Sequence, residues 1–197
     1  MKKRIALLLA LLLALSGCSP NLASLADRED WDETWVGVGL YLGVEPFGYD
    51  FELMDNKDVL AANGLYYTTW VVGEPEEYVN SDGNTVDLYA SQLYLLLEVC
   101  ASPSDAAQEI AEWQAISEEN YTVLSQTGQT VEGRTFTVLT YLCGEENPYS
   151  SGAVAFGSLG ECAVSAEISC REDFGGDAGE ILAAFLRCCH YFGEEAA

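Results

Sequence analysis

The stretch ECAVSAEISC, residues 161–170, alternates cleanly between two sets of side chains. Alternation with a period of two is typical of a β-strand, because successive side chains point to opposite faces of a sheet. One set comprises Cys162, Val164, Ala166, Ile168 and Cys170. The other set comprises Glu161, Ala163, Ser165, Glu167 and Ser169. The stretch therefore predicts a strand of an antiparallel sheet, with one face in the core and the other in solvent.

Further strands are predicted on both sides of this stretch. Residues 152–157 form a hairpin with it around Leu159-Gly160, and residues 65–73 (LYYTTWVVG) have the aromatic and β-branched composition of a strand. Residues 86–100 are predicted as one long strand, and their apolar middle fits a strand covered on both faces. A single helical turn is expected at 55–62. The other predicted strands are 36–44, 49–53, 121–126 and 131–143, the last two separated by Thr127-Gly128.

Two amphipathic helices are predicted, each with a capping signal. The first begins at Ser102-Pro103-Ser104-Asp105, where Ser102 can cap and Pro103 suits the first helical position. Its inner face is marked by Ile110, Trp113 and either Ile116 or Ser117. The second helix opens with Asp177-Ala178-Gly179-Glu180, which has the spacing of a capping box, and is predicted to reach about residue 191. Its buried stripe comprises Ile181, Leu182, Phe185, Leu186 and Cys189.

This order of elements resembles the Mog1/PsbP-like family of small exported proteins. The resemblance is carried by YDFEL at 49–53, by the helix at 102–120, by Gly133-Arg134-Thr135-Phe136, and by Ile181-Leu182 with Phe185. It implies an α+β fold in which two main helices pack on an antiparallel sheet as an α/β/α sandwich. It also implies a non-catalytic scaffold that binds partners, and it transfers no active site.

The N-terminus has the anatomy of an export signal. MKKR at 1–4 is basic, and the apolar stretch at 5–15 is too short for a membrane-spanning helix. Leu15-Ser16-Gly17-Cys18 resembles the bacterial lipobox, in which a branched apolar residue and two small residues precede an invariant cysteine. The resemblance implies that the Cys18 thiol is diacylated and that the bond between Gly17 and Cys18 is cleaved. Two acyl chains on one residue give stable membrane anchoring.

These observations predict the organisation of the chain. Residues 1–17 form the signal peptide, residues 18–34 an acidic tether, residues 35–193 a single globular domain, and residues 194–197 a short tail. The expected location is the bacterial membrane, with the domain lipid-anchored and facing outward. The domain is expected to be a monomer.

The charge of the chain restricts its partners. The formal charge is −24, and removal of the signal with its three basic residues takes it to −27. Such a surface repels phosphate backbones, which excludes nucleic acid as a partner. Cationic ligands, basic peptides and divalent metal ions are compatible with the field, as is a role in solubility alone. The five remaining fixed cations are Arg28, Lys57, Arg134, Arg171 and Arg187.

The cysteines leave two alternatives open. Besides Cys18 the chain has Cys100, Cys143, Cys162, Cys170, Cys188 and Cys189. Export permits disulfides, and the sensible pairs join Cys162 or Cys170 to Cys188 or Cys189. Alternatively, the thiols fill the core, because the chain is 49% hydrophobic and does not need covalent links. No CxxC spacing is present, so neither a zinc site nor a thioredoxin-type pair is expected.

The remaining candidate sites are weaker. His190 is the only histidine, and it is interpreted as a residue at a helix end rather than a catalytic base. Oxygens of Asn80, Asp82, Asn84 and Asp87 could surround calcium, but a plain hairpin turn is favoured because the EF-hand glycine is missing. No metal and no cofactor are therefore predicted. An aromatic region that could stack a sugar or a peptide, although such a stripe more often belongs to the core, comprises Tyr66, Tyr67, Trp70, Tyr89 and Tyr94.

The sequence thus predicts an exported lipoprotein with a binding or accessory domain for an unknown protein, peptide or small ligand. The competing hypotheses are a surface hydrolase that uses carboxylates and a purely structural envelope component. An enzyme of that kind needs a pocket with converging carboxylates of raised pKa. A binding domain needs an exposed aromatic or apolar patch without such a pair.

Overall fold

The computed structural model describes residues 33–37, 40–44, 47, 49–54, 65–131, 133–159 and 161–193. Within these residues the chain forms twelve strands and two helices. In order they are β1 (Glu33–Gly37), β2 (Leu40–Val44), β3 (Glu52–Leu53), β4 (Leu65–Val72), β5 (Glu76–Val79), β6 (Thr85–Leu88), β7 (Ser91–Val99), α3 (Pro103–Asn120), β8 (Thr122–Val131), β9 (Arg134–Leu142), β10 (Ser151–Leu159), β11 (Cys162–Cys170), α4 (Ala178–Cys188) and β12 (Cys189–Gly193).

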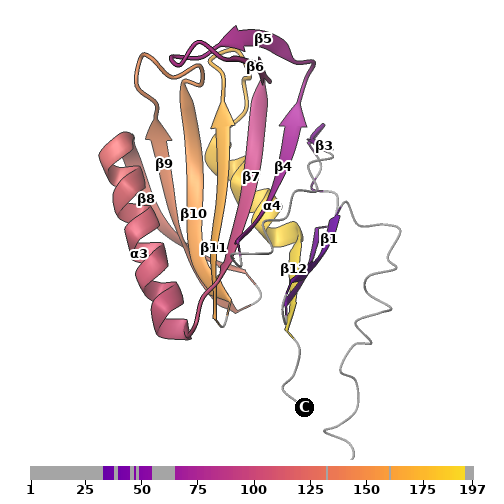
Figure 1. Cartoon of the computed structure of the whole chain (residues 1–197), viewed down its shortest axis with the longest axis vertical. Coiled ribbons are helices and arrows are strands. Elements are labelled where there is room, and N and C mark those ends of the chain that lie inside the picture. The colour runs from indigo at the N-terminus through magenta and orange to yellow at the C-terminus, as the bar shows by residue number, and fades with distance from the viewer. Residues whose placement is uncertain are drawn as a thin grey trace, which may run out of the picture.

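Seven strands form the main sheet, in the order β3-β4-β7-β11-β10-β9-β8, and every neighbouring pair is antiparallel. β11, the strand with the alternating sequence, occupies the middle of this sheet between β7 and β10 (Figure 1). α3 lies in front of the sheet in Figure 1 and α4 behind it. The predicted α+β architecture, with two main helices packed on an antiparallel sheet, is confirmed.

The two helices bury opposite faces of the sheet. On the α4 side, Ile181, Leu182, Phe185 and Leu186 are buried against the inward side chains of the sheet. That face of the core includes Trp70, Leu93, Leu95, Leu97, Phe136, Val138, Val164, Ala166 and Ile168. On the α3 side, a smaller cluster comprises Leu139, Tyr141, Val154 and Phe156, with Ile110, Trp113, Tyr121 and Cys143 packed against it.

The position of α3 corrects the prediction for the second face of β11. That face was expected in solvent, but Ala163 is fully buried, and Ser165, Glu167 and Ser169 are half-buried. The reason is that β11 is a central strand and that α3 packs against part of this face. A polar residue such as Glu167 therefore needs partners inside the protein.

Both helix starts follow the sequence. Ser102 caps α3, with its hydroxyl accepting a bond from the Asp105 amide at 3.2 Å, and Asp177 caps α4 through the Glu180 amide at 2.8 Å. On α3, Ile116 is exposed and Ser117 half-buried, which settles the alternative for the inner face in favour of Ser117. α4 ends at Cys188, earlier than predicted, because the chain continues as strand β12 and pairs with β2.

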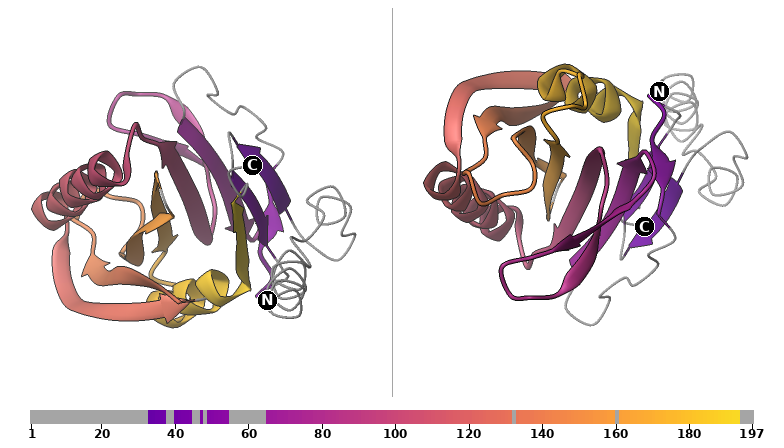
Figure 2. Two further views of the ribbon diagram at one scale, coloured as in Figure 1. Left: turned by 90° about the horizontal axis from the view of Figure 1, so that it is seen from below. Right: turned by 90° about the horizontal axis from the view of Figure 1, so that it is seen from above.

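Two small sheets flank the main one. β1, β2 and β12 form a three-stranded sheet, so the stretch predicted as one strand at 36–44 belongs to a hairpin of β1 and β2 (Figure 2). Residues 33 and 34, assigned to the tether, lie in β1. β5 and β6 form a separate hairpin that lies at the upper end of the sheet in Figure 1.

Other predicted boundaries need correction. The long strand expected at 86–100 is two strands, β6 and β7, because Ala90 leaves the hairpin and its amide bonds to Val72 at 3.1 Å. β8 runs without a break through Thr127-Gly128, and its turn to β9 comes at Gly133, whose φ of 77° suits glycine. β3 holds only two residues of the strand expected at 49–53. The helical turn predicted at 55–62 lies outside the described residues.

Candidate functional site

The buried face of β11 contains one carboxylate, Glu167. The hydroxyl of Tyr121 donates a hydrogen bond to Glu167 Oε1 at 3.1 Å, and the hydroxyl of Tyr141 donates to the same oxygen. Tyr121 follows the end of α3, and Tyr141 belongs to β9. Three elements therefore converge on a single side chain. The second oxygen, Oε2, accepts no hydrogen bond from any residue that the structure describes.

Tyr141 reaches Glu167 across the intervening strand β10. Tyr141 is opposite Gly152 of β10, and a Cβ on Gly152 would lie 2.5 Å from Tyr141 Cζ. Because glycine has no side chain, the tyrosine ring lies across β10 at this point and its hydroxyl extends to β11. The ring of Tyr121 stacks on that of Tyr141, with centroids 4.0 Å apart and planes inclined by 5°.

The environment of Glu167 disfavours its charged form. Burial raises the pKa of this carboxyl, while the hydrogen bonds from Tyr141 and Tyr121 lower it less strongly. The pKa values of both tyrosines are raised in turn, first by burial and then by the charge of Glu167. A desolvated acid beside a cavity is a recognised sign of a functional site.

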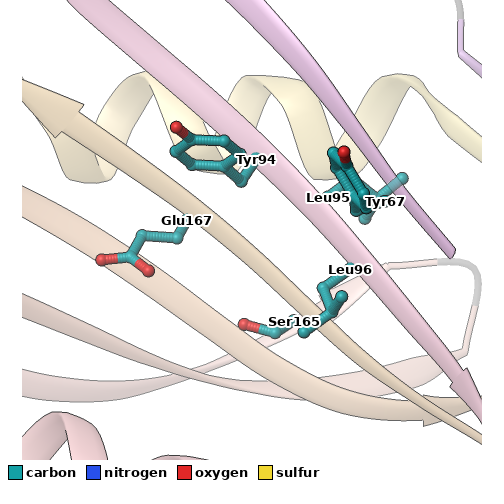
Figure 3. Close-up of a pocket in the computed structure, with 6 residues that line it drawn as sticks. All are labelled: Tyr67, Tyr94, Leu95, Leu96, Ser165 and Glu167. Carbon is teal, nitrogen blue, oxygen red and sulfur yellow. The ribbon is translucent and has the colours of Figure 1, made fainter. Parts of the chain in front are cut away.

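A cavity of about 200 Å³ lies beside Glu167, on the part of this face that belongs to β4, β7 and β11. Figure 3 shows its two sides. The Glu167 carboxylate and the Ser165 hydroxyl point toward one side of the view, and Tyr67 and Leu96 stand on the other. The cavity is therefore lined mainly by apolar surface, and Glu167 and Ser165 form its one polar end. Its lining comprises Tyr67, Tyr94, Leu95, Leu96, Ser165 and Glu167.

A second cavity, of about 340 Å³, lies under the β5–β6 hairpin and the loop that connects β9 to β10. Arg171, which follows β11, pairs with Glu76 of β5 at 2.9 Å and so ties this hairpin to the end of the sheet. The polar and aromatic lining of the cavity includes Tyr78, Asn80, Asp87, Gln92, Tyr94, Glu146 and Tyr149.

Tyr94 lines both cavities and separates them. It projects from β7, and 38% of it is exposed, which is high for a residue on the fourth position of a nine-residue strand in the sheet interior. Gln92, two residues earlier on the same face, donates a hydrogen bond from Nε2 to the Tyr94 hydroxyl at 2.7 Å. This bond fixes the ring as a wall between the two cavities. We call the two cavities with Tyr94 the tyrosine groove.

The aromatic region divides between core and cavity. Tyr67 and Tyr94 line the tyrosine groove. Trp70 belongs to the core, because it points to the face opposite Thr69 and lies fully buried on the α4 side, 5.1 Å from the Phe185 ring centroid. Tyr89 is half-buried, and the structure does not describe the side chain of Tyr66.

Glu167 and Gln92 were not singled out as functional from the sequence. A signal was present for Glu167, because it is the one ionisable side chain inside the alternating core strand, between Ala166 and Ile168. The significance of Glu167 depends on the central position of β11, which the local sequence does not show. Gln92 has no such signal, because a polar residue near the start of a strand is ordinary.

The loop considered for calcium forms the hairpin turn that the sequence favoured. Asn80 Oδ1 accepts bonds from the amides of Asp82 at 3.1 Å and Asn84 at 2.9 Å, and Gly83 has a φ of 80°. The loop is the favoured hairpin turn between β5 and β6, and Asn80 already uses its oxygen within it. No group of three His, Cys, Asp or Glu side chains among the described residues has a geometry that could hold a metal ion.

The cysteines that the structure describes lie mostly in or near the core. Cys100, Cys143, Cys162 and Cys170 are free thiols, and Cys170 Sγ lies 3.5 Å from the Ser91 hydroxyl. Cys188 ends α4 and Cys189 begins β12. Pairing of Cys162 or Cys170 with these two stays a prediction. Gly17 and Cys18 lie outside the described residues, as does the side chain of His190. Among the described residues no helix is both long and apolar enough to cross a bilayer.

Comparisons with known proteins show a weak similarity in fold and no match in sequence. No protein-family model matches the sequence, and no curated protein sequence matches it. The solution structure of cyanobacterial PsbP (CyanoP) from Synechocystis sp. PCC 6803 is weakly similar in fold, with a TM-score of 0.43 and 10% identity over 80% of this chain and 91% of that one. A crystal structure from Bacteroides thetaiotaomicron VPI-5482 gives a TM-score of 0.37 and 9% identity, over 82% of this chain and 49% of that one.

Proposed function

We propose that this chain is an exported bacterial lipoprotein, anchored through lipid on Cys18, whose domain binds a partner or ligand in the tyrosine groove without catalysing a reaction. The anchor is supported by the lipobox-like Leu15-Ser16-Gly17-Cys18 behind a basic end and an apolar stretch. The binding role is supported by one observation above others, namely that Tyr94 stands exposed between two cavities on the face of the sheet that contains Glu167.

The chemistry of the first cavity favours binding over hydrolysis. Glycoside hydrolysis and related reactions use two carboxylates that face each other across the substrate. Among the described residues, Glu167 is the only carboxylate that lines the cavity beside it, and its hydrogen-bond donors are two tyrosines rather than a second acid. An aromatic wall with one charged group is typical of a recognition site.

The second cavity keeps a hydrolase as the alternative function. Asp87 and Glu146 both line it, from β6 and from the loop after β9. We expect no turnover of a bound ligand by the wild type, by Asp87→Asn or by Glu146→Gln, while both variants should alter the affinity for it. Turnover of a bound ligand that is lost in both variants would favour the hydrolase.

The anchor is tested by the intact mass of the protein extracted from membranes. A species that begins at Cys18 and carries acyl mass supports the proposal. The Cys18→Ser variant should instead yield a chain that carries no acyl mass and keeps its signal peptide. A wild-type species without acyl mass would overturn it. This experiment is independent of the groove.

The groove is tested with fluorine-labelled tyrosine in the full chain, extracted in a non-ionic detergent. The Tyr67→Phe and Tyr94→Phe variants assign their two resonances. A set of small cations, anions and neutral compounds is then added. The proposal predicts that binders shift the Tyr67 or Tyr94 signal. Absence of any shift across the set, or shifts confined to other tyrosines, would contradict it.

A further inference from the structure

Every charged side chain in the described lining of the tyrosine groove is acidic. Glu167 lines the first cavity, and Asp87 and Glu146 line the second, while no Lys, Arg or His is among the described residues that line either. The nearby Arg171 is engaged by Glu76 and Asp173, at 2.9 and 3.4 Å. The whole chain adds to this field with a formal charge of −24. Such a groove attracts cations and repels anions.

The described residues leave one carboxylate oxygen of Glu167 open to a further hydrogen bond. Both tyrosine hydroxyls bond to Oε1, so Oε2 has no donor among the described residues. A buried carboxylate is stabilised when a cation and its hydrogen bonds complete its shell. Burial raises the pKa of the Glu167 carboxyl, and a cation beside its carboxylate would lower it.

We propose that the tyrosine groove binds a basic peptide segment of a partner protein, with a lysine or arginine side chain seated beside Glu167. This inference rests on the proposed binding function and names its ligand. The amine or guanidinium approaches Glu167 and Ser165 at the polar end of the first cavity. The apolar stem of the same side chain lies along Leu96 and the rings of Tyr67 and Tyr94 (Figure 3).

The shape of the cavity fits that ligand better than a neutral one. An apolar side chain would fill the end at Tyr67 and Leu96 but would leave the Glu167 oxygen without a donor. A basic side chain satisfies both ends, because its stem is apolar and its head is charged. The tyrosine faces add a cation–π contribution, since the negative face of the ring attracts a nearby cation.

The second cavity provides a seat for a second basic residue. Gln92 borders it, and Leu96 lines the first cavity four residues further along β7. At about 3.3 Å per residue these positions are roughly 13 Å apart. An extended peptide in the groove would therefore place basic residues about four positions apart, one beside Glu167 and one near Asp87 and Glu146.

The test uses three acetylated and amidated pentapeptides on the full chain in non-ionic detergent, monitored by the Tyr94 fluorine signal. The peptides are KAAAK, the same peptide with norleucine in place of both lysines, and KAAAK with glutamate in place of both lysines. Norleucine preserves the stem and removes the charge. We expect KAAAK to bind about tenfold more tightly than the norleucine peptide at low salt, with the advantage reduced at high salt.

The variant Glu167→Gln removes the charge and retains an oxygen that accepts the tyrosine hydrogen bonds. It should weaken KAAAK about tenfold and leave the norleucine peptide unchanged. Glu98→Gln is the matched control, because Glu98 lies on the same face of β7 and outside both cavity linings. It should change the affinity for KAAAK by less than about twofold.

The outcomes separate this inference from the proposed function. Equal binding of the lysine and norleucine peptides, or equal loss in Glu167→Gln and Glu98→Gln, would overturn the basic-peptide proposal and leave the groove as a binding site. Preference for the glutamate peptide would do the same. If no compound of any charge shifts Tyr67 or Tyr94, both proposals fail together.

Discussion

Tyr141 lies directly over Gly152, and this contact places the tyrosine hydroxyl at Glu167 two strands away. Tyr141 and Gly152 face each other on β9 and β10, and a Cβ on Gly152 would also meet the carbonyl oxygen of Ile168 on β11. A similar pair exists on the opposite face, where a Cβ on Gly157 would lie 2.5 Å from Phe136 Cδ1. On each face of the sheet, a glycine therefore leaves the space that an aromatic ring from the neighbouring strand occupies.

Gly152→Ala should destabilise the domain. The added methyl overlaps the Tyr141 ring and the Ile168 backbone, neither of which can move without disturbing the sheet, so the cost should be that of overpacking a core, about 1–3 kcal/mol. The measurement is chemical denaturation followed by tryptophan fluorescence.

Gly128→Ala serves as the control for that substitution. Gly128 also lies within a strand, but a Cβ there meets nothing within 4 Å. It should be neutral or slightly stabilising, because alanine restricts the unfolded chain more than glycine does. Equal stability of the two variants would show that Tyr141 does not lie over Gly152.

Glu167→Gln should stabilise the domain at neutral pH. The pKa of Glu167 is raised above the ordinary value of 4.5, chiefly by burial, so the folded state binds the proton more tightly than the unfolded state. The wild type therefore loses stability as pH rises from about 4.5 through the raised pKa, whereas glutamine does not titrate. The advantage of the variant should grow across that window and vanish below it.

The check is a series of denaturation curves from pH 4 upward. Glu119→Gln, at the exposed end of α3, removes the same charge without entering the cluster. The difference in the free energy of unfolding between Glu119→Gln and the wild type should not grow comparably with pH. A Glu167→Gln variant that is less stable than the wild type at pH 7 would mean that the carboxylate already has a compensating cation.

The layers of the fold were predictable from the sequence because they depend on local patterns. Ser102 and Asp177 cap the helices as expected, and the alternation at 162–170 identifies a strand. Strand order is not encoded locally. The burial of Glu167 follows from the position of β11 between β7 and β10, and the period of two is the same for a central and an edge strand.

The errors in boundaries share one physical cause. Glycines were taken as ends of strands, but Gly128 and Gly152 lie within β8 and β10. At Gly152 the missing side chain makes space for an aromatic ring from the next strand, which only the paired sheet reveals. The extension of the chain into β12 beyond α4 was missed similarly, because its partner β2 is about 150 residues earlier in the sequence.

Tyr141→Phe should destabilise the domain more than Tyr121→Phe. Tyr141 is buried and its hydroxyl bonds to Glu167, while Tyr121 is only half-buried and its bond to the same oxygen is 3.1 Å long. Loss of a hydrogen bond to a charged group costs about 1.5–3 kcal/mol. A double-mutant cycle should show coupling, because both hydroxyls donate to one oxygen. Additive effects would indicate that the two tyrosines act independently.

Cys143 should report the charge on Glu167. Burial, and after it the charge of Glu167, raises the pKa of the Cys143 thiol to about 11, so only about one molecule in a thousand carries the thiolate at pH 8. Alkylation of Cys143 in the native protein should therefore be on the order of a hundredfold slower than that of an ordinary thiol.

In Glu167→Gln the rate of alkylation at Cys143 should rise. The rate at Cys100 should not change, because the charges that raise its pKa come from Glu98, Glu109 and Asp105. Peptide mass spectrometry after timed alkylation measures both rates in one sample, and equal acceleration at the two cysteines would indicate loosening of the fold rather than loss of a charge.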